Sequence, residues 1–401
     1  MKYLLALLAL TSVLSGQKLL VVDVDDLGKE FVGAHPQSFF NALDQYGRHY
    51  DRFYTYPVCS PTRACAHYGV HGTHPDLQSP WLISTSGGFG TQATPVRGNI
   101  EPLGQALSSK SIAKIGKWHM SLVNDLTHPN DCGWDHYAGV MGNPLDYYNY
   151  SMNVNGTAQP VSGLYLTKCE TDLAISAMEA GHDLVWLSYH TIHDPWHVPP
   201  AGTYSGPVPT TDYDKAVAML ENLNHELWRL GVQALVNGYH LILFSDNGGK
   251  QLTGGQKGSV LESGINTDMW LYGPGVVPGE DNSLVGCYDL YRTIMQFFGI
   301  APSQAQGPES VSFLLTAIGV PGGRDSIFSE RYLTNNVTPD PLDPDWIRAV
   351  IGHEYKFLIR PNGERLYLLP NEVSNLLNSG ITPEEQAAYD FLTAQLLVWT
   401  Q

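Results

Sequence analysis

Short apolar runs alternate along the chain with longer segments that have helical periodicity. The apolar runs lie at 18–24, 111–115, 184–188 and 240–244, and the helical segments lie at 101–109, 170–180 and 212–236. Apolar runs without regular polar alternation are typical of strands that are buried on both faces, as in a parallel sheet. The alternation therefore predicts an α/β fold in which helices cover both faces of a mostly parallel sheet.

A different pattern begins after residue 308. Short strand candidates at 326–332, 347–352, 356–359 and 365–368 follow one another without long helices between them, which predicts a small antiparallel sheet. The segment 383–399 has the pattern of a closing amphipathic helix, because Pro383 and two glutamates occupy its first turn. We therefore expect a large domain at 17–308 and a small C-terminal antiparallel α+β subdomain at 309–401.

The first sixteen residues have the pattern of a secretory signal peptide. One lysine precedes an apolar run from Leu4 to Leu14, and the small residues Ser15 and Gly16 follow it. This run is too short for a membrane span. Gln17 stands where a lipoprotein signal would have its lipidated cysteine. The segment 1–16 therefore predicts a secreted or periplasmic protein with no membrane span, whose mature chain begins near Gln17.

The net charge limits the possible binding partners, and the cysteine content limits the possible disulfides. The formal net charge of −17 opposes binding to nucleic acid or to an anionic membrane surface. Five cysteines are too few for a disulfide scaffold. With Cys59 set aside, four thiols allow three disulfide pairings or remain free: Cys65, Cys132, Cys169 and Cys287.

Polar side chains follow each of the predicted parallel strands closely. Asp25 and Asp26 follow the first strand, Lys117 and His119 the second, His193 the third, and Asp246 with Asn247 the fourth. Ligands of open parallel sheets bind beyond the carboxyl ends of the strands, where loops from separate strands converge. One site is therefore expected to collect all of these residues.

The acidic pairs have two interpretations. Asp25, Asp26, Asp246 and Asn247 offer only oxygen ligands, which suit Ca²⁺ or Mg²⁺ and fit zinc poorly. Taken alone, Asp25-Asp26 is equally typical of a strand-to-helix turn, and Asn247-Gly248 is a common turn dipeptide. Because both pairs follow strands that lead to the same edge, we interpret them as a divalent metal site.

Three histidines, His190, His193 and His197, would have the spacing of a zinc site if they lay on a helix. The prolines at 195, 199 and 200 argue against a continuous helix there. We therefore treat His193 as a catalytic candidate, and His190 and His197 as structural or substrate-facing residues.

The pentapeptide Cys59-Ser60-Pro61-Thr62-Arg63 matches the pattern C-x-P-x-R. By itself this string is also typical of a turn in which Pro61 opens a helix at its first position. Together with D-D-L-G at 25–28, G-K-W-H at 116–119, S-D-N-G at 245–248 and K-G-S at 257–259, it resembles the type I, formylglycine-dependent sulfatases of the alkaline phosphatase superfamily. The resemblance covers nearly the whole mature chain and implies an alkaline-phosphatase-like α/β/α sandwich, with 17–308 as the catalytic sulfatase domain.

The resemblance also implies a role for each site residue. Cys59 matches the residue that a formylglycine-generating maturation enzyme oxidises to Cα-formylglycine, whose hydrate is the nucleophile. Arg63 and Lys117 match the groups that hold this hydrate and the sulfate, and His119 matches the base on the hydrate. His193 and Lys257 match the groups that face the leaving oxygen. The implied ligands of Ca²⁺, or of Mg²⁺, are Asp25, Asp26, Asp246 and Asn247 with the modified Cys59.

The implied function is hydrolysis of sulfate monoesters, and export together with the acidic composition favours a sulfated carbohydrate, small or oligomeric, as the substrate. The chain departs from the family at Lys29-Glu30, at Ile192 and at Asn266, none of which is a catalytic position. Two alternatives stay open. The same nucleophile serves phosphonate and phosphate ester hydrolases, and an inactive glycan-binding relative is a non-enzymatic reading of the same motifs.

Overall fold

The computed structural model describes residues 17–74, 100–331 and 346–400, so the predicted signal peptide at 1–16 lies outside the described residues. The main sheet has eleven strands, and its central strands run parallel in the order β8, β1, β7, β3, β4. Their bounds are β1 Lys18–Val24, β3 Ile112–Gly116, β4 His136–Gly139, β7 Leu184–Tyr189 and β8 Tyr239–Ser245. β1 therefore lies in the middle of the sheet, between the strands that follow α7 and α8 in the sequence.

Antiparallel strands extend the parallel centre on both sides. β9 (Asn266–Tyr272) pairs antiparallel with β8 and with β2 (Arg48–Tyr54), and β10 (Gly279–Asp281) and β11 (Val285–Gly286) lie parallel to β2. At the other edge, β5 (Asn149–Val154) and β6 (Thr157–Ser162) continue from β4 as an antiparallel meander. The side chains of the outermost strand β6 are mostly exposed, as an edge strand requires.

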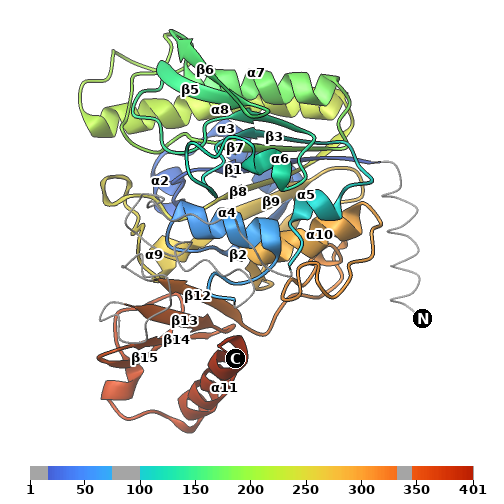
Figure 1. Cartoon of the computed structure of the whole chain (residues 1–401). Helices are drawn as coiled ribbons and strands as arrows, with labels where there is room; N and C mark the ends of the chain where they lie inside the picture. Colours follow the sequence, from blue (N-terminus) through green and yellow to red (C-terminus); the bar gives the residue numbers. More distant parts are fainter. Residues whose placement is uncertain (1–16, 75–99, 332–345, 401) are drawn as a thin grey trace.

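Helices cover both faces of this sheet (Figure 1). Successive side chains of a strand point to opposite faces, so Leu20 and Val22 pack in one layer, while Leu19 and Val21 pack in the other. The first layer contains α2 (Lys29–Ala34), α3 (Ser38–Tyr46), α7 (Leu166–Glu179) and α8 (Asp212–Val236). The second contains α4 (Cys59–Tyr68), α5 (Leu103–Ala106) and α10 (Leu290–Phe297). The predicted α/β/α sandwich is confirmed.

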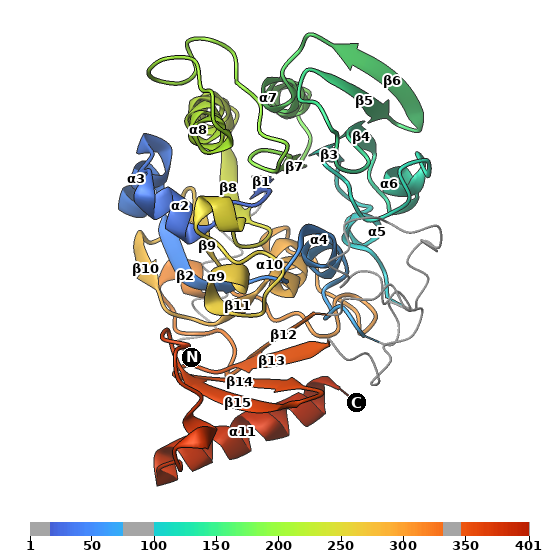
Figure 2. The ribbon, with the colours of Figure 1, turned by 90° about the vertical axis from the view of Figure 1, so that its left-hand side faces the viewer.

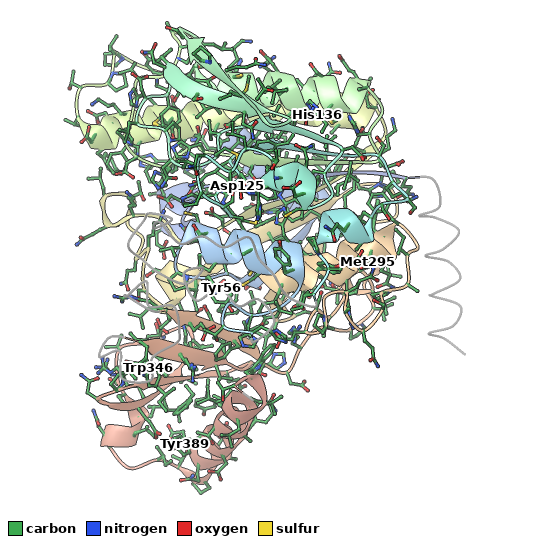
Figure 3. The ribbon with its side chains drawn as sticks, in the orientation of Figure 1. Tyr56, Asp125, His136, Met295, Trp346 and Tyr389 are labelled. Atoms are coloured by element: carbon green, nitrogen blue, oxygen red, sulfur yellow. The ribbon has the colours of Figure 1, made fainter. Side chains whose placement is uncertain are left out.

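The C-terminal part forms a second sheet. β12 (Ile327–Arg331), β13 (Ile347–Ile351), β14 (Tyr355–Arg360) and β15 (Gly363–Leu368) pair antiparallel in sequence order. One face carries α11 (Pro383–Trp399), where Tyr389, labelled in Figure 3, packs edge-on against Phe357 of β14 at 5.4 Å between ring centroids. Figure 2 shows this unit below the main sheet, with α7 and α8 at the opposite end of the molecule. The predicted antiparallel sheet and closing helix are confirmed.

Two local expectations differ from the structure. The segment 101–109 contains only the short helix α5, because Ser108 and Ser109 favour turns over a helix interior and the chain then enters β3. α4 begins at Cys59 rather than at Pro61, since a proline is tolerated anywhere in a first turn whose N–H groups have no intrahelical acceptor. The predicted domain boundary at 308 stays a prediction. The remaining helices are α6 His128–Asp131, α9 Glu262–Ile265, η2 Gln251–Thr253, η3 Cys287–Asp289, η4 Thr316–Ile318 and η5 Leu376–Asn378.

Candidate active site

The carboxyl ends of β1, β3, β7 and β8 meet at one edge of the parallel sheet. The turn after β1 carries Asp25 and Asp26, and the turn after β8 carries Asp246 and Asn247. The backbone N–H of Asp26 donates to Asp246 Oδ1 at 3.3 Å, which joins the two turns. The loops after β3, β7 and η2 and the first turn of α4 bring in the other predicted residues: Lys117, His119, His193, Lys257, Cys59 and Arg63. The fold thus places all of the predicted site residues together.

Cys59 is the first residue of α4 and is 5% exposed. Its Sγ lies 3.6 Å from Lys117 Nζ and 3.2 Å from His119 Nδ1. The same imidazole nitrogen lies 3.1 Å from the hydroxyl of Ser60. Burial raises the pKa of the Cys59 thiol, and Lys117 and Lys257 only partly offset this rise. An oxygen nucleophile at this position would have a cation and a ring nitrogen within reach.

Each acidic side chain of the site contacts a cationic side chain. Lys117 Nζ donates to Asp25, and Lys257 Nζ donates to Asp26. Arg63 donates from Nη2 to Asp246 Oδ2 at 2.7 Å. Burial by itself would raise the pKa of the Asp25 carboxyl, but Lys117 and the other neighbouring groups outweigh it and hold that pKa well below its ordinary value.

Several oxygens in this cluster are buried and accept no hydrogen bond within the described part of the chain: Asp25 Oδ1, Asp26 Oδ2 and Asn247 Oδ1. Possible ligand atoms of Asp25, Cys59 and Asp246 all lie within 4.8 Å of one another. Burial and the neighbouring Asp25 raise the pKa of Asp246 to about 7, because both disfavour the charged form of its carboxyl group. Convergent, unsatisfied oxygens of this kind fit a hard divalent cation such as Ca²⁺ or Mg²⁺.

The loop after β7 is not helical from 190 to 200, as its prolines indicated, so the zinc interpretation loses the geometry on which it depended. His193 lies near the carboxylate cluster, since its ring and the carboxylates of Asp25 and Asp26 offer atoms within 4.8 Å of one another. Its Nδ1 lies 3.2 Å from Asp194 Oδ1, and Lys250 donates to the same carboxylate. The buried ring of His190 stacks on His193 at 4.9 Å, which makes His190 a packing neighbour.

Both candidate proton carriers are neutral imidazoles in this environment. Burial lowers the pKa of His119 well below its ordinary value, and Lys117 lowers it further. Burial likewise lowers the pKa of His193, and Lys257 adds to the effect. A neutral ring can accept a proton at its free nitrogen, as a general base requires.

Arg63 is 3% exposed and lies between two carboxylates. Its Nη1 lies 2.7 Å from Asp23 Oδ1, and its Nη2 lies 2.7 Å from Asp246 Oδ2. The side-chain contacts of Arg63 in this structure are therefore with these carboxylates and with the carbonyl oxygen of Lys117, to which Nη1 donates at 3.4 Å. The role toward the hydrate and the sulfate that the resemblance implies stays a prediction.

Asp23 is the residue that the sequence reasoning missed. It is buried in the middle of β1, where its Oδ2 accepts hydrogen bonds from Trp186 Nε1 at 2.9 Å and from Ser188 Oγ. Lys114 on β3 lies 3.9 Å away, and burial lowers the pKa of Lys114 to about 7. A signal was present, because a carboxylate inside an otherwise apolar buried strand needs a partner. From its position in the middle of the sheet, Asp23 forms an ion pair with Arg63 and so fixes the position of the guanidinium.

We predict that Asp23→Asn destabilises the protein strongly. The amide keeps the shape of the side chain but removes the charge that faces Arg63, and loss of one partner from a buried ion pair costs about 3 to 5 kcal/mol. Urea denaturation followed by circular dichroism would measure the free energy of unfolding. Lys168→Ala is the matched control, because it breaks the half-exposed Lys168–Asp172 pair on α7, for which we expect less than about 0.5 kcal/mol. A wild-type unfolding curve for Asp23→Asn would refute this assignment.

Glycine and left-handed residues shape the loops around the site. Gly116 has φ 83°, and a Cβ at this position would lie 2.1 Å from the carbonyl oxygen of Ser188, so only glycine allows Lys117 to leave the sheet here. Asp26 and His119 have φ values of 61° and 56°, which side chains other than glycine adopt rarely. Such backbone conformations persist only where surrounding contacts hold them, and they concentrate at functional sites.

The other sequence expectations concern thiols and membranes. All five cysteines lie within the described residues, and each is a buried, free thiol. In the part of the chain that the structure describes, no helix combines the length and the apolar character that a bilayer crossing demands.

Curated relatives of the chain include named sulfatases. Mouse arylsulfatase J is 23% identical over 325 residues, which cover 69% of this chain and 52% of that protein. The uncharacterized sulfatase YdeN of Escherichia coli K12 is 26% identical over 245 residues, which cover 50% of this chain and 44% of that protein. The chain thus spans about half the length of these curated relatives. No family model matches the chain.

Solved structures share the fold at low sequence identity. Ps i-CgsB in complex with k-i-k-neocarrahexaose has a TM-score of 0.78 at 19% identity, with 96% of this chain and 92% of that chain covered. A protein in complex with its substrate D-glucosamine-2-N,6-O-disulfate has a TM-score of 0.72 at 15% identity, with 96% and 97% covered. The arrangement of the sheet and the shared architecture agree with the motifs of the sequence, and the chain is similar in sequence to proteins that are named as sulfatases.

Proposed function

We propose that the protein hydrolyses sulfate monoesters of carbohydrates, with residue 59 as the nucleophile. The observation that carries the proposal is the position of Cys59. It lies at the N-terminus of α4, within reach of Lys117 and His119, and beside a carboxylate cluster with unsatisfied buried oxygens. An inactive glycan-binding protein does not require a nucleophile, a base and metal ligands in one site. The arrangement therefore favours an enzyme over a glycan-binding protein.

Two groups complete the proposed site. A formylglycine-generating enzyme would oxidise Cys59, and the hydrated aldehyde would supply the hydroxyl nucleophile. Asp25, Asp26, Asp246 and Asn247 fit a Ca²⁺ or Mg²⁺ ion through the buried oxygens described above. When bound, such a cation supplies positive charge that acidifies a nearby hydroxyl and stabilises the oxygens of a sulfuryl group.

The residues of the chain itself bind and orient the ester. Lys117 contacts Asp25 and Lys257 contacts Asp26 of the carboxylate cluster, and Lys117 Nζ also lies 3.6 Å from the Sγ of Cys59. The N-terminus of α4 adds the partial positive charge of its backbone N–H groups. Together these groups favour a sulfate oxyanion directly next to position 59.

Two histidines divide the proton transfers. His119 Nδ1, 3.2 Å from the Cys59 Sγ, is placed to take a proton from a hydroxyl at position 59. His193 lies next to Asp25 and Asp26, and its neighbour Asp194 contacts the ring at Nδ1. The negative charge of a bound ester raises the pKa of a nearby imidazole, so that His193 can carry a proton to the leaving alcohol oxygen.

The substrate class and the cellular location belong to the same proposal. Arylsulfatase J and YdeN are sulfatases by name, and structures of the same fold contain a neocarrahexaose and a disulfated glucosamine. The predicted signal peptide at 1–16 supports a secreted or periplasmic enzyme that meets such glycans outside the cytoplasm. In this proposal 17–308 is the catalytic domain, and 309–401 completes it as a subdomain.

A comparison of matched aryl esters tests the reaction. A phosphate monoester carries nearly twice the negative charge of a sulfate monoester, so the two aryl esters differ mainly in the charge that the site must accommodate. We expect kcat/KM for 4-nitrophenyl sulfate to exceed that for 4-nitrophenyl phosphate by about 100-fold or more, with modification of Cys59 verified by mass spectrometry. A preference for the phosphate, or for a phosphonate ester, would favour the alternative hydrolase.

A further inference from the structure

A cavity of about 690 Å³ opens beside the candidate active site. One wall is the loop that follows β8, which contributes Gln251, Gln256, Lys257 and Ser259, and the other wall includes Arg331 at the end of β12. We call this cavity the Lys257–Arg331 pocket. Its volume falls within the range of about 300–1,000 Å³ that is usual for small-molecule sites. The pocket therefore has room for a sugar unit of the substrate, between the large domain and the C-terminal sheet.

The pocket continues directly from the reaction centre. Lys257 lines it, and the Nζ of the same side chain donates to Asp26 within the carboxylate cluster. A substrate whose sulfate lies next to Cys59 would extend past Lys257 into this space.

The backbone of the loop is not free to bind a ligand. The N–H groups of residues 254, 255, 257 and 258 donate to the carbonyl oxygens of Gln251, Lys250, Gly249 and Pro57 at 2.8–3.1 Å. The N–H groups of Gln256 and Ser259 are also used, with Ser263 and Gln256 as their acceptors. Recognition in the pocket therefore depends on side chains.

Those side chains are cationic or neutral and polar. Lys257 and Arg331 supply the charges, Gln251, Gln256 and Ser259 supply amide and hydroxyl groups, and the described lining of the pocket includes no carboxylate. This composition contrasts with the net charge of −17 of the whole chain. A cationic pocket in a strongly acidic protein favours an anionic ligand, because its two cations locally offset the repulsion that the net charge of the protein exerts on anions.

We propose that the Lys257–Arg331 pocket binds the sugar on the leaving-alcohol side of the substrate, and that this sugar carries a second anionic group, a carboxylate or a further sulfate, which Arg331 recognises. The inference rests on the proposed function, because it assumes that the scissile sulfate lies next to Cys59. Arginine suits this role, since its planar guanidinium binds carboxylate and sulfate oxygens through paired hydrogen bonds. The preferred substrate is then a glycan with at least two negative charges.

Turnover of three disaccharides tests this specificity. One carries a single sulfate on an otherwise neutral pair of hexoses, the second adds a uronate carboxylate, and the third adds a second sulfate. We expect the wild-type enzyme to have a KM lower by about tenfold or more for at least one doubly charged disaccharide. In Arg331→Gln this advantage over the singly charged disaccharide should disappear. The anionic group, carboxylate or second sulfate, whose effect on KM is lost in Arg331→Gln is the group that Arg331 recognises.

A matched control and a binding measurement complete the test. Arg365→Gln changes an arginine of β15 in the same sheet that does not line the pocket, and it should keep the wild-type preference. Calorimetric titration of the three disaccharides into Cys59→Ala, with and without Arg331→Gln, reports on the pocket without turnover. Equal affinity for singly and doubly charged disaccharides would overturn this inference, even if 4-nitrophenyl sulfate is hydrolysed. Retained affinity differences in a protein that hydrolyses no sulfate ester would instead contradict the proposed function alone.

Discussion

Replacement of Cys59 by serine is expected to abolish multiple turnover of 4-nitrophenyl sulfate. A serine hydroxyl would occupy the same place at the start of α4, next to His119 and Lys117, so folding should be preserved. A serine can attack sulfur, but it lacks the second hydroxyl through which a hydrated aldehyde expels sulfate and regenerates itself. We expect kcat to fall by about 10⁴-fold or more, which is the scale of losses seen when a nucleophile is removed.

Mass spectrometry and a second cysteine variant make this result specific. The tryptic peptide that contains residue 59 should have the mass of the aldehyde in the active wild-type protein and that of serine in the variant. Cys169→Ser is the matched control, because Cys169 is a buried free thiol on α7, in the other helix layer. It should keep wild-type turnover. Steady-state activity in Cys59→Ser, or in protein that carries only unmodified cysteine, would exclude the proposed nucleophile.

Removal of divalent metal is expected to have a similarly large effect. The carboxylates of Asp25, Asp26 and Asp246 crowd together around buried oxygens that accept no hydrogen bond from described residues, and a cation relieves their repulsion. Exhaustive chelation should reduce turnover by about 10³-fold or more, and Ca²⁺ or Mg²⁺ should restore it. Stability provides a second measurement that does not depend on activity. A ligand present at about 100 times its Kd adds about 2.7 kcal/mol to the free energy of unfolding.

Variants of two buried aspartates separate this effect from a general response to salt. Asp26→Asn should lose the stabilisation by Ca²⁺, because it removes a carboxylate whose Oδ2 has no partner among the described residues. Asp281→Asn changes a buried aspartate that pairs with Arg48 at the sheet edge, and it should keep the full response to Ca²⁺. Full activity of protein shown by elemental analysis to be free of metal would refute the metal site.

Much of the fold follows from local patterns. The apolar run at 18–24 forms β1 with the same bounds, and the segments at 212–236 and 383–399 form α8 and α11 with the same bounds. β1 and α8 bury most of their apolar residues, so the period of the pattern reports directly on these elements. α11 buries only Leu392, and its first turn, with Pro383 and two glutamates, is the stronger signal there. The segment 101–109 fails because its periodic residues lie in a short helix and a turn, where packing against the core decides the backbone.

The sequence pattern also predicts which side chains gather at the candidate site. Polar residues directly after four parallel strands had to meet at one sheet edge, because parallel strands share the direction of their carboxyl ends. This topological fact brings Asp25, Lys117, His193 and Asp246 together without any knowledge of their contacts. Linear order and chemistry were enough to predict which side chains share the site.

The partners of those side chains depend on distances across the sheet, which a linear pattern does not contain. Arg63 on α4 contacts Asp23, which lies in β1, and Asp246, which follows β8. Arg63 and Asp246 are 183 positions apart in the sequence. The pocket beside Lys257 likewise exists only because the C-terminal sheet brings Arg331 to the loop after β8. Side-chain chemistry and periodicity thus specify which groups gather at the site, whereas packing between distant segments specifies which carboxylate each cation faces and which surface the substrate meets.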